Sequence, residues 1–102
     1  MTTEELNNLW SFGVDIIRDD IVDGLPGSPF LCPIARAVAR RLNLQNNCGS
    51  VKVYPDPDGL QIYDEKGNRK IFHLPQNVCQ RIRSFDNHRL MTPFSFVAVA
   101  ES

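Results

Sequence analysis

Residues 51–74 read VKVYPDPDGLQIYDEKGNRKIFHL, and this stretch decides the fold. Apolar and polar side chains alternate in three short runs, a pattern typical of strands with one buried face. The three runs are Val51–Tyr54, Leu60–Tyr63 and Arg69–Leu74. They are separated by Asp58-Gly59 and Gly67-Asn68, and such dipeptides favour tight hairpin turns. The stretch therefore predicts three consecutive antiparallel strands.

A helix is predicted on either side of these strands. Upstream, Pro33 follows Cys32, and proline is favoured at the first helical position. Downstream, Pro75 opens a second helix, which should end near Asp86. Apolar residues recur on one face of each helix at the helical period. They are Ile34, Ala35, Val38, Ala39 and Leu42 in the first helix, and Val78, Ile82 and Phe85 in the second.

The remaining segments complete an α+β pattern. We expect a short helix within Thr2–Trp10, a strand over Val14–Arg18, a helical turn capped by Asp19 or Asp20 and stopping at Gly24, and a last strand over Phe94–Val99. We predict one α+β domain over residues 1–102, with residues 1–13 as a helical extension. It is a two-layer domain, in which two main helices cover one face of a mainly antiparallel sheet of four or five strands.

The composition is that of an ordinary globular protein. Hydrophobic residues make up 42% of the 102 residues, charged residues 23%, and the formal net charge is −1. Nucleic-acid and anionic-membrane binders usually carry a basic excess, so neither partner is favoured. Residues 1–6 contain two glutamates and no basic residue, and no apolar run approaches the ~20 residues that span a bilayer. With three cysteines, an odd number, we expect a cytoplasmic protein that binds no membrane.

Cys32 is the candidate reactive thiol. It lies at a predicted helix N-terminus, where backbone N–H groups and the helix dipole stabilise a thiolate. A catalytic cysteine also needs a base, and the sequence offers only His73 and His88. The alternative is a small buried residue that packs the preceding loop. No Cys-x-x-Cys pair is present, and Val38 takes the arginine position of a Cys-x5-Arg motif, so we expect the structural role and assign no catalytic residue.

A metal site has few candidate ligands. The sulfur and imidazole ligands are Cys32, Cys48, Cys79, His73 and His88. No two of them have the close spacing of a zinc knuckle. We therefore expect no metal and no cofactor.

Arginines form the only basic concentration in the sequence, and arginine outnumbers lysine, which favours bidentate recognition of anionic groups. The candidate binding residues are Arg36, Arg40, Arg41, Arg81 and Arg83. If the two helices pack on the same side of the sheet, these side chains merge into one positive face. Such a face binds phosphate, nucleic acid or an acidic protein.

Arg36 and Arg40 are four residues apart on the first main helix, opposite its apolar stripe. No acidic residue stands three or four places away on this helix to neutralise them. One interpretation is a fork that grips a partner's carboxylate or phosphate. The other is that Asp19, Asp20 or Asp23, just upstream, folds back to pair with them.

Two segments carry a resemblance to a known group of proteins. Cys32-Pro33-Ile34-Ala35-Arg36-Ala37 resembles the Cys-Pro-[Ile/Val]-Ala-x-Ala signature of small proteins encoded by bacteriophages and their bacterial hosts. In those proteins a segment like Asp20–Gly24 often precedes the signature. They also tend to end, as here, with a Leu-Pro-opened helix, a Phe85-Asp86 pair and Pro-Phe-Ser-Phe at 93–96. The resemblance implies a phage or prophage accessory protein and carries no activity.

We therefore expect a non-enzymatic accessory protein that binds a host or phage macromolecule, as an inhibitor of a host system or in another role. A protein is the expected partner, and the host cytoplasm is the expected location if the protein is phage-encoded. Two other interpretations stay open. One is a thiol-dependent enzyme or redox protein that uses Cys32, and the other is a nucleic-acid binder that uses the arginine face.

Overall fold

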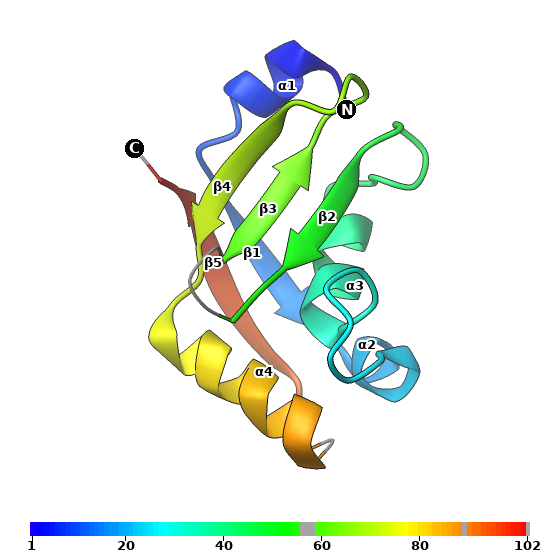
Figure 1. The fold of residues 1–102 in the computed structure, drawn as a ribbon, viewed down its shortest axis with the longest axis vertical. Coiled ribbons are helices and arrows are strands. Elements are labelled where there is room, and N and C mark those ends of the chain that lie inside the picture. The colour runs from blue at the N-terminus through cyan, green and yellow to red at the C-terminus, as the bar shows by residue number, and fades with distance from the viewer. Residues whose placement is uncertain (56–58, 89, 102) are drawn as a thin grey trace.

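The structure is a computed structural model of residues 1–102, and it describes residues 1–55, 59–88 and 90–101. The chain runs helix, strand, two helices, three strands, helix, strand (Figure 1). The helices are α1 (Thr3–Asn7), α2 (Arg18–Asp23), α3 (Pro33–Arg41) and α4 (Gln76–His88). The strands are β1 (Ser11–Ile16), β2 (Ser50–Val53), β3 (Leu60–Tyr63), β4 (Arg69–His73) and β5 (Phe94–Ala100). The predicted α+β class is confirmed.

The five strands form one antiparallel sheet in the order β1-β5-β4-β3-β2. The predicted meander is confirmed, since β2 pairs with β3 and β3 with β4. Residues 56–58 of the first predicted turn, Asp58 included, lie outside the described residues, but Gly59 has a φ of +61°. Gly67, in the second turn, has a φ of +85°. Both glycines thus occupy the left-handed region that a turn requires.

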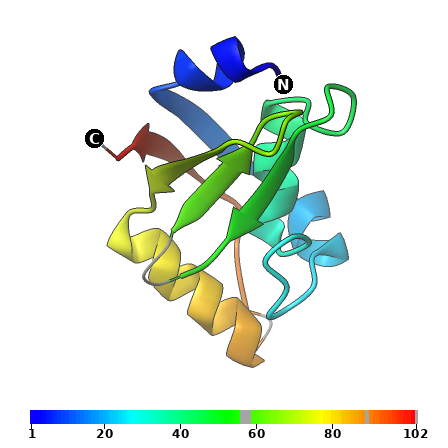
Figure 2. The same cartoon turned by 45° about the horizontal axis from the view of Figure 1, so that its top comes forward.

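The sheet is curled, and α3 lies between its two edge strands. β1 and β2 stand at opposite ends of the strand order, yet α3 contacts both. α4 lies across one end of the strands, and the two views agree on this arrangement (Figures 1 and 2). The two predicted main helices therefore pack on the sheet as expected, but around a curled sheet instead of a flat layer.

The core fills the concave side of this sheet. In β1 burial alternates, with Phe12, Val14 and Ile16 buried and the intervening residues exposed. Phe12 meets Phe72 of β4 edge to face, with ring centroids 5.4 Å apart. From the helices, the core takes mainly Ile34, Ala35, Ala37 and Val38 of α3 and Val78, Cys79, Ile82 and Phe85 of α4. The apolar stripe predicted for α4 is therefore confirmed.

The N-terminal segment packs against the core, and the short helix expected within Thr2–Trp10 is α1. Residues 11–13, which were expected in the helical extension, belong to β1 instead. α1 begins after Thr2, whose hydroxyl accepts a hydrogen bond from the Glu5 N–H, while the Glu5 carboxylate accepts one from the Thr2 N–H. Leu6 is 2% exposed and joins the core. Lys70 of β4 donates to the carbonyls of Leu6 and Asn7, where a cation complements the helix C-terminus.

Two expected boundaries are wrong. The first strand covers Ser11–Ile16 instead of Val14–Arg18, because its alternation already starts at Phe12 and passes through Gly13. Arg18 begins α2 instead. Asp20 does not precede that helix as a cap: it stands in the first turn and its carboxylate accepts a hydrogen bond from the Ile17 N–H at 3.0 Å. The other end matches, since α2 ends at Asp23, next to Gly24.

The remaining helix and strand ends lie close to their predictions. α3 begins at Pro33 after the N-cap Cys32. α4 runs two residues beyond Asp86, to His88, and β5 extends to Ala100. Among the described residues, we find no helix of the length and apolar character needed to cross a membrane.

Candidate functional site: a groove on the exposed face of α3

The exposed face of α3 forms the floor of a groove. Arg36, Ala39, Arg40 and Asn43 follow the i, i+3, i+4, i+7 spacing that places side chains on one side of a helix. The pocket above them has a volume of about 520 Å³. Its walls are Asp20 of α2, Phe30 and Leu31 of the preceding loop, and Gln45 and Asn46 of the following loop. Ala39, the small residue among them, leaves the floor hollow.

Gly24 allows α2 to lie against the start of α3 and so to wall this groove. A Cβ atom at Gly24 would stand 2.6 Å from the Asp20 carbonyl oxygen and 2.7 Å from two ring carbons of Pro33. Real Cβ atoms do not approach other atoms so closely, so a larger residue would force α2 away from α3.

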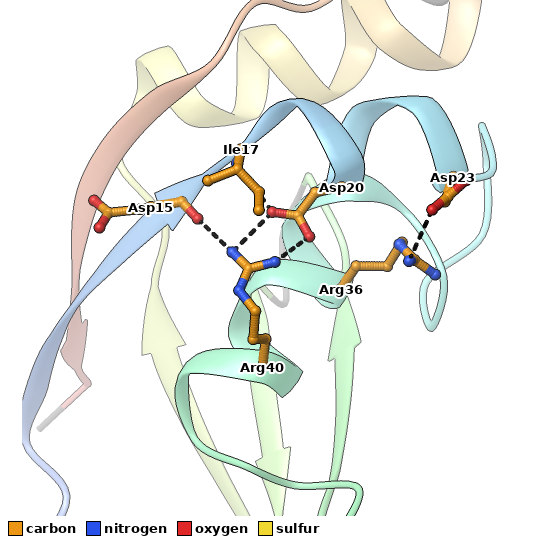
Figure 3. A network of polar contacts seen from close by, with 6 residues as sticks. All are labelled: Asp15, Ile17, Asp20, Asp23, Arg36 and Arg40. Atoms are coloured by element: carbon orange, nitrogen blue, oxygen red, sulfur yellow. Dashed lines mark hydrogen bonds and ion pairs between the residues drawn. The ribbon is translucent and has the colours of Figure 1, made fainter.

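Both terminal nitrogens of the Arg40 guanidinium are bound within the protein, although the side chain is 46% exposed (Figure 3). Asp20 is 2% exposed and accepts hydrogen bonds from both terminal nitrogens of Arg40, the second at 3.0 Å. The same guanidinium donates to the Asp15 carbonyl at 2.9 Å. The hydrogen bond with Asp20 raises the pKa of Arg40 above its ordinary value. The sequence left open whether an upstream aspartate pairs with this arginine, and the structure shows that Asp20 does.

Arg40 and Arg41 cover the free edge of β1. Among the described residues this strand pairs only with β5, so one edge has no partner strand there. On that edge the Asp15 carbonyl accepts from Arg40, and the Gly13 carbonyl accepts from Nε of Arg41 at 3.1 Å. The two arginines thus take the place of a neighbouring strand. This role cannot be predicted from the sequence, because it depends on α3 lying beside β1.

Arg36 is held much more loosely than Arg40. Its terminal nitrogen lies 3.5 Å from a carboxylate oxygen of Asp23, and the two side chains are 35% and 61% exposed (Figure 3). Its Nε is buried and has no hydrogen-bond partner within the part of the chain that the structure describes. Exposed ion pairs of this kind contribute little to stability. Of the two arginines on the groove floor, Arg36 is therefore the one whose guanidinium can change partners.

An exposed apolar cluster adjoins the groove. Leu25, Phe30 and Leu31 are 47%, 51% and 47% exposed. A backbone hydrogen bond of 2.9 Å from the Leu25 N–H to the Leu31 carbonyl brings the two ends of this loop together. Phe30 also lies beside Lys52 of β2, whose Nζ is 5.4 Å from the ring centroid. This cluster was not predicted from the sequence, although two of its residues, Phe30 and Leu31, directly precede Cys32 and Pro33.

The accessible polar groups of the groove are mainly hydrogen-bond donors and amides. Asp20 is the single carboxylate among the residues that line it, and its oxygens are occupied by Arg40 and by the Ile17 N–H. Asn43, which has a φ of +54°, follows α3 and accepts a hydrogen bond from the Asn46 amide. An amide group has two donor hydrogens and an acceptor oxygen, so both side chains retain hydrogen-bonding capacity after this contact.

Cys32 has the environment of a structural residue. It is 3% exposed, and its sulfur accepts from the Ala35 N–H at 3.4 Å. Burial raises the pKa of its thiol, and the hydrogen bonds from Ala35 and Ile34 oppose that shift without cancelling it. The pocket beside it measures about 90 Å³, well below the ~300–1,000 Å³ of typical small-molecule sites. These features are those of an unreactive thiol.

The other candidate residues are spread over the fold. Arg81 of α4 stacks on the ring of Phe94, with its guanidinium carbon 4.4 Å from the centroid, and Arg83 is exposed on the same helix. Both histidines are exposed, His73 on β4 and His88 at the end of α4. Within the described ranges, no three His, Cys, Asp or Glu side chains are grouped to hold a metal ion.

Known proteins offer no guide to the function of this chain, so any functional conclusion rests on the fold and this groove. No family model, no curated protein and no solved structure matches the chain.

Proposed function

We propose that the protein is a small non-enzymatic binding protein that recognises another protein through Leu25, Phe30 and Leu31 and the adjoining groove on α3. The exposure of these three large apolar side chains beside a polar-rimmed pocket is the observation that carries the proposal. Protein-binding sites commonly combine an apolar centre with a polar rim.

The distribution of exposed apolar residues supports this location. The described residues contain nine exposed large hydrophobic side chains, and five of them fall within residues 17–31. These five are Ile17, Val22, Leu25, Phe30 and Leu31. Single exposed apolar residues are ordinary, but a concentration within one short segment suggests a contact surface.

The resemblance to phage and prophage proteins suggests the biological setting of this binding. In that setting the partner is a host or phage protein, and binding serves an accessory role such as inhibition of a host system. The groove suits such a role, because a short segment of the partner is enough to occupy it.

The two other interpretations of the sequence receive less support. A thiol enzyme would use a sulfur that is 3% exposed and whose pKa is raised by burial. A nucleic-acid binder would use Arg36 and Arg40, which pair with Asp23 and Asp20. The charge that phosphate would meet at this helix is therefore largely balanced.

A pull-down from bacterial lysate with mass-spectrometric identification tests the proposal. The double variant Phe30→Ser/Leu31→Ser removes two apolar side chains at the groove, and its control, Val97→Ser/Val99→Ser, removes two that are also about half exposed, on β5. Thermal melting first establishes that all three proteins are folded. We expect a protein that the wild type and the β5 variant retain and the Phe30/Leu31 variant loses. Retention by all three, or by none, would contradict the proposal.

A further inference from the structure

We infer that the groove on α3 binds an extended acidic peptide segment, with one carboxylate on Arg36 and an apolar neighbour on Phe30 and Leu31. This inference rests on the proposed function, because it specifies the chemistry of the partner at the same surface. The two arginines on the groove floor differ in how firmly their guanidinium groups are held.

Arg40 is unsuited to a ligand because its guanidinium is committed to Asp20 and the Asp15 carbonyl. Arg36 is available because, among the described residues, its guanidinium is held by the 3.5 Å ion pair with Asp23, whose side chain is 61% exposed. A ligand carboxylate can replace Asp23 there while water hydrates the displaced aspartate. The exchange keeps the charge balance of the guanidinium and replaces a long contact with a short charge-assisted hydrogen bond.

The dimensions of the groove fit a short stretch of extended chain. Within α3, from Arg36 to Arg40, the floor rises about 6 Å at the helical rise of ~1.5 Å per residue, and Asn43 lies beyond the end of the helix. The helical part of the floor corresponds to about two residues of extended peptide at ~3.3 Å each. Among the lining residues, Phe30 and Leu31 precede α3 in the chain, and Gln45 and Asn46 follow it.

The lining favours a peptide over a nucleotide. Asn43, Gln45 and Asn46 offer amide donors and acceptors, which match the alternating N–H and C=O groups of a peptide backbone. A phosphate would carry more negative charge than a carboxylate, yet it would meet one loosely held guanidinium, with Asp23 near it. A single carboxylate with apolar side chains beside it is the better electrostatic match.

Three end-blocked tripeptides, Leu-Glu-Leu, Leu-Gln-Leu and Leu-Lys-Leu, test the inference in NMR titrations of the backbone amides of Ala39, Asn43 and Asn46. We expect the glutamate peptide to shift these amides in a saturable way and the glutamine peptide to bind about fivefold more weakly, because it lacks the charged contact. Arg36→Gln should reduce the glutamate peptide to the level of the glutamine peptide. Asp23→Asn, the matched control, should strengthen its binding by removing the competing carboxylate.

The outcomes separate this inference from the proposed function. Equal binding of the three peptides, or unchanged binding by Arg36→Gln, would overturn the acidic preference while leaving apolar recognition by Phe30 and Leu31 intact. No shift with any peptide would overturn the inference, and the pull-down with the Phe30→Ser/Leu31→Ser variant then decides the proposed function independently. Tighter binding of uridine 5′-monophosphate at the same amides would also overturn it, since the groove would then select phosphate.

Discussion

Replacing Arg40 with methionine should destabilise the protein far more than the same change at Arg36. Methionine keeps most of the apolar stem and removes the guanidinium, so the two variants compare ion pairs and not packing. Arg40→Met leaves the carboxylate of Asp20, a residue that is 2% exposed, with the hydrogen bond from the Ile17 N–H but without its ion pair. Arg36→Met removes only the 3.5 Å contact with Asp23.

The magnitudes follow from burial. Breaking a buried ion pair by removing one partner costs about 3–5 kcal/mol, because a buried charge is left uncompensated. The Arg40 side chain is 46% exposed, so water can partly replace it, and we expect about 2–3 kcal/mol. For the exposed pair of Arg36 the expected cost is about 0–1 kcal/mol.

Urea unfolding followed by circular dichroism measures both effects. With an m value of about 1 kcal/mol per M, the midpoint should fall by about 2–3 M for Arg40→Met and by less than about 1 M for Arg36→Met. The double variant Asp20→Asn/Arg40→Met should recover about 1 kcal/mol, because the orphaned charge is gone. Equal and small losses from Arg40→Met and Arg36→Met would refute the reasoning, since they would mean that Asp20 is not held as the structure shows.

Three further predictions test other parts of the fold. Phe85 is 2% exposed, so Phe85→Ala should lower the free energy of unfolding in urea by about 3–5 kcal/mol. The control Gln80→Ala changes an exposed residue of the same helix and should alter it by no more than about 0.5 kcal/mol. Similar small losses from both variants would mean that α4 is misplaced. In the native protein at neutral pH a thiol reagent should label exposed Cys48 first, with Cys32 and Cys79 protected until unfolding; rapid labelling of Cys32, located by peptide mapping, would contradict its structural role. Burial acts to raise the pKa of Asp64, but hydrogen bonds from Asn68, Thr3 and Lys66 outweigh it and hold the pKa below its ordinary value. The ionised carboxylate therefore stabilises the fold near neutral pH, and this stabilisation is lost as the pH falls through the lowered pKa. Asp64→Asn should therefore lower the unfolding midpoint clearly at pH 6 and much less near pH 2.5, and a difference that does not depend on pH would argue against it.

Local sequence signals predicted most of the fold. The alternation in residues 51–74 and the prolines at 33 and 75 placed three strands and two helices, because each signal depends on a few neighbouring residues. The prediction failed at β1, where Gly13 takes an exposed position that carries no polar side chain, and where Ile17 and Arg18 resemble a continuation of the strand. There the helix start depends on Asp20 reaching back to the Ile17 N–H, a contact that spacing alone does not separate from an ordinary cap.

The candidate site was less predictable, for a different reason. The sequence identified Arg36 and Arg40 as a pair on the exposed face of one helix, and the structure places both on the groove floor. It did not distinguish them, because their different partners, Asp23 and Asp20, depend on how α2 lies against α3. Likewise, Phe30 and Leu31 appear as ordinary loop residues until the loop that carries them is placed beside the groove.

The excess of arginine over lysine has an explanation within the fold. A free strand edge exposes unpaired backbone groups and invites pairing with other chains. On β1 two carbonyls of that edge accept hydrogen bonds from Arg40 and Arg41, and Arg40 also clamps the Asp20 carboxylate. A lysine ammonium, a compact point charge, lacks the planar fork that lets one side chain clamp a carboxylate and contact a strand edge at once. The bidentate recognition that the composition indicated is therefore partly internal. In the last turn of α3, Arg40 and Arg41 cover the edge of the sheet. Arg36 lies one turn earlier, and its guanidinium is the one on this helix that can exchange its partner for a ligand.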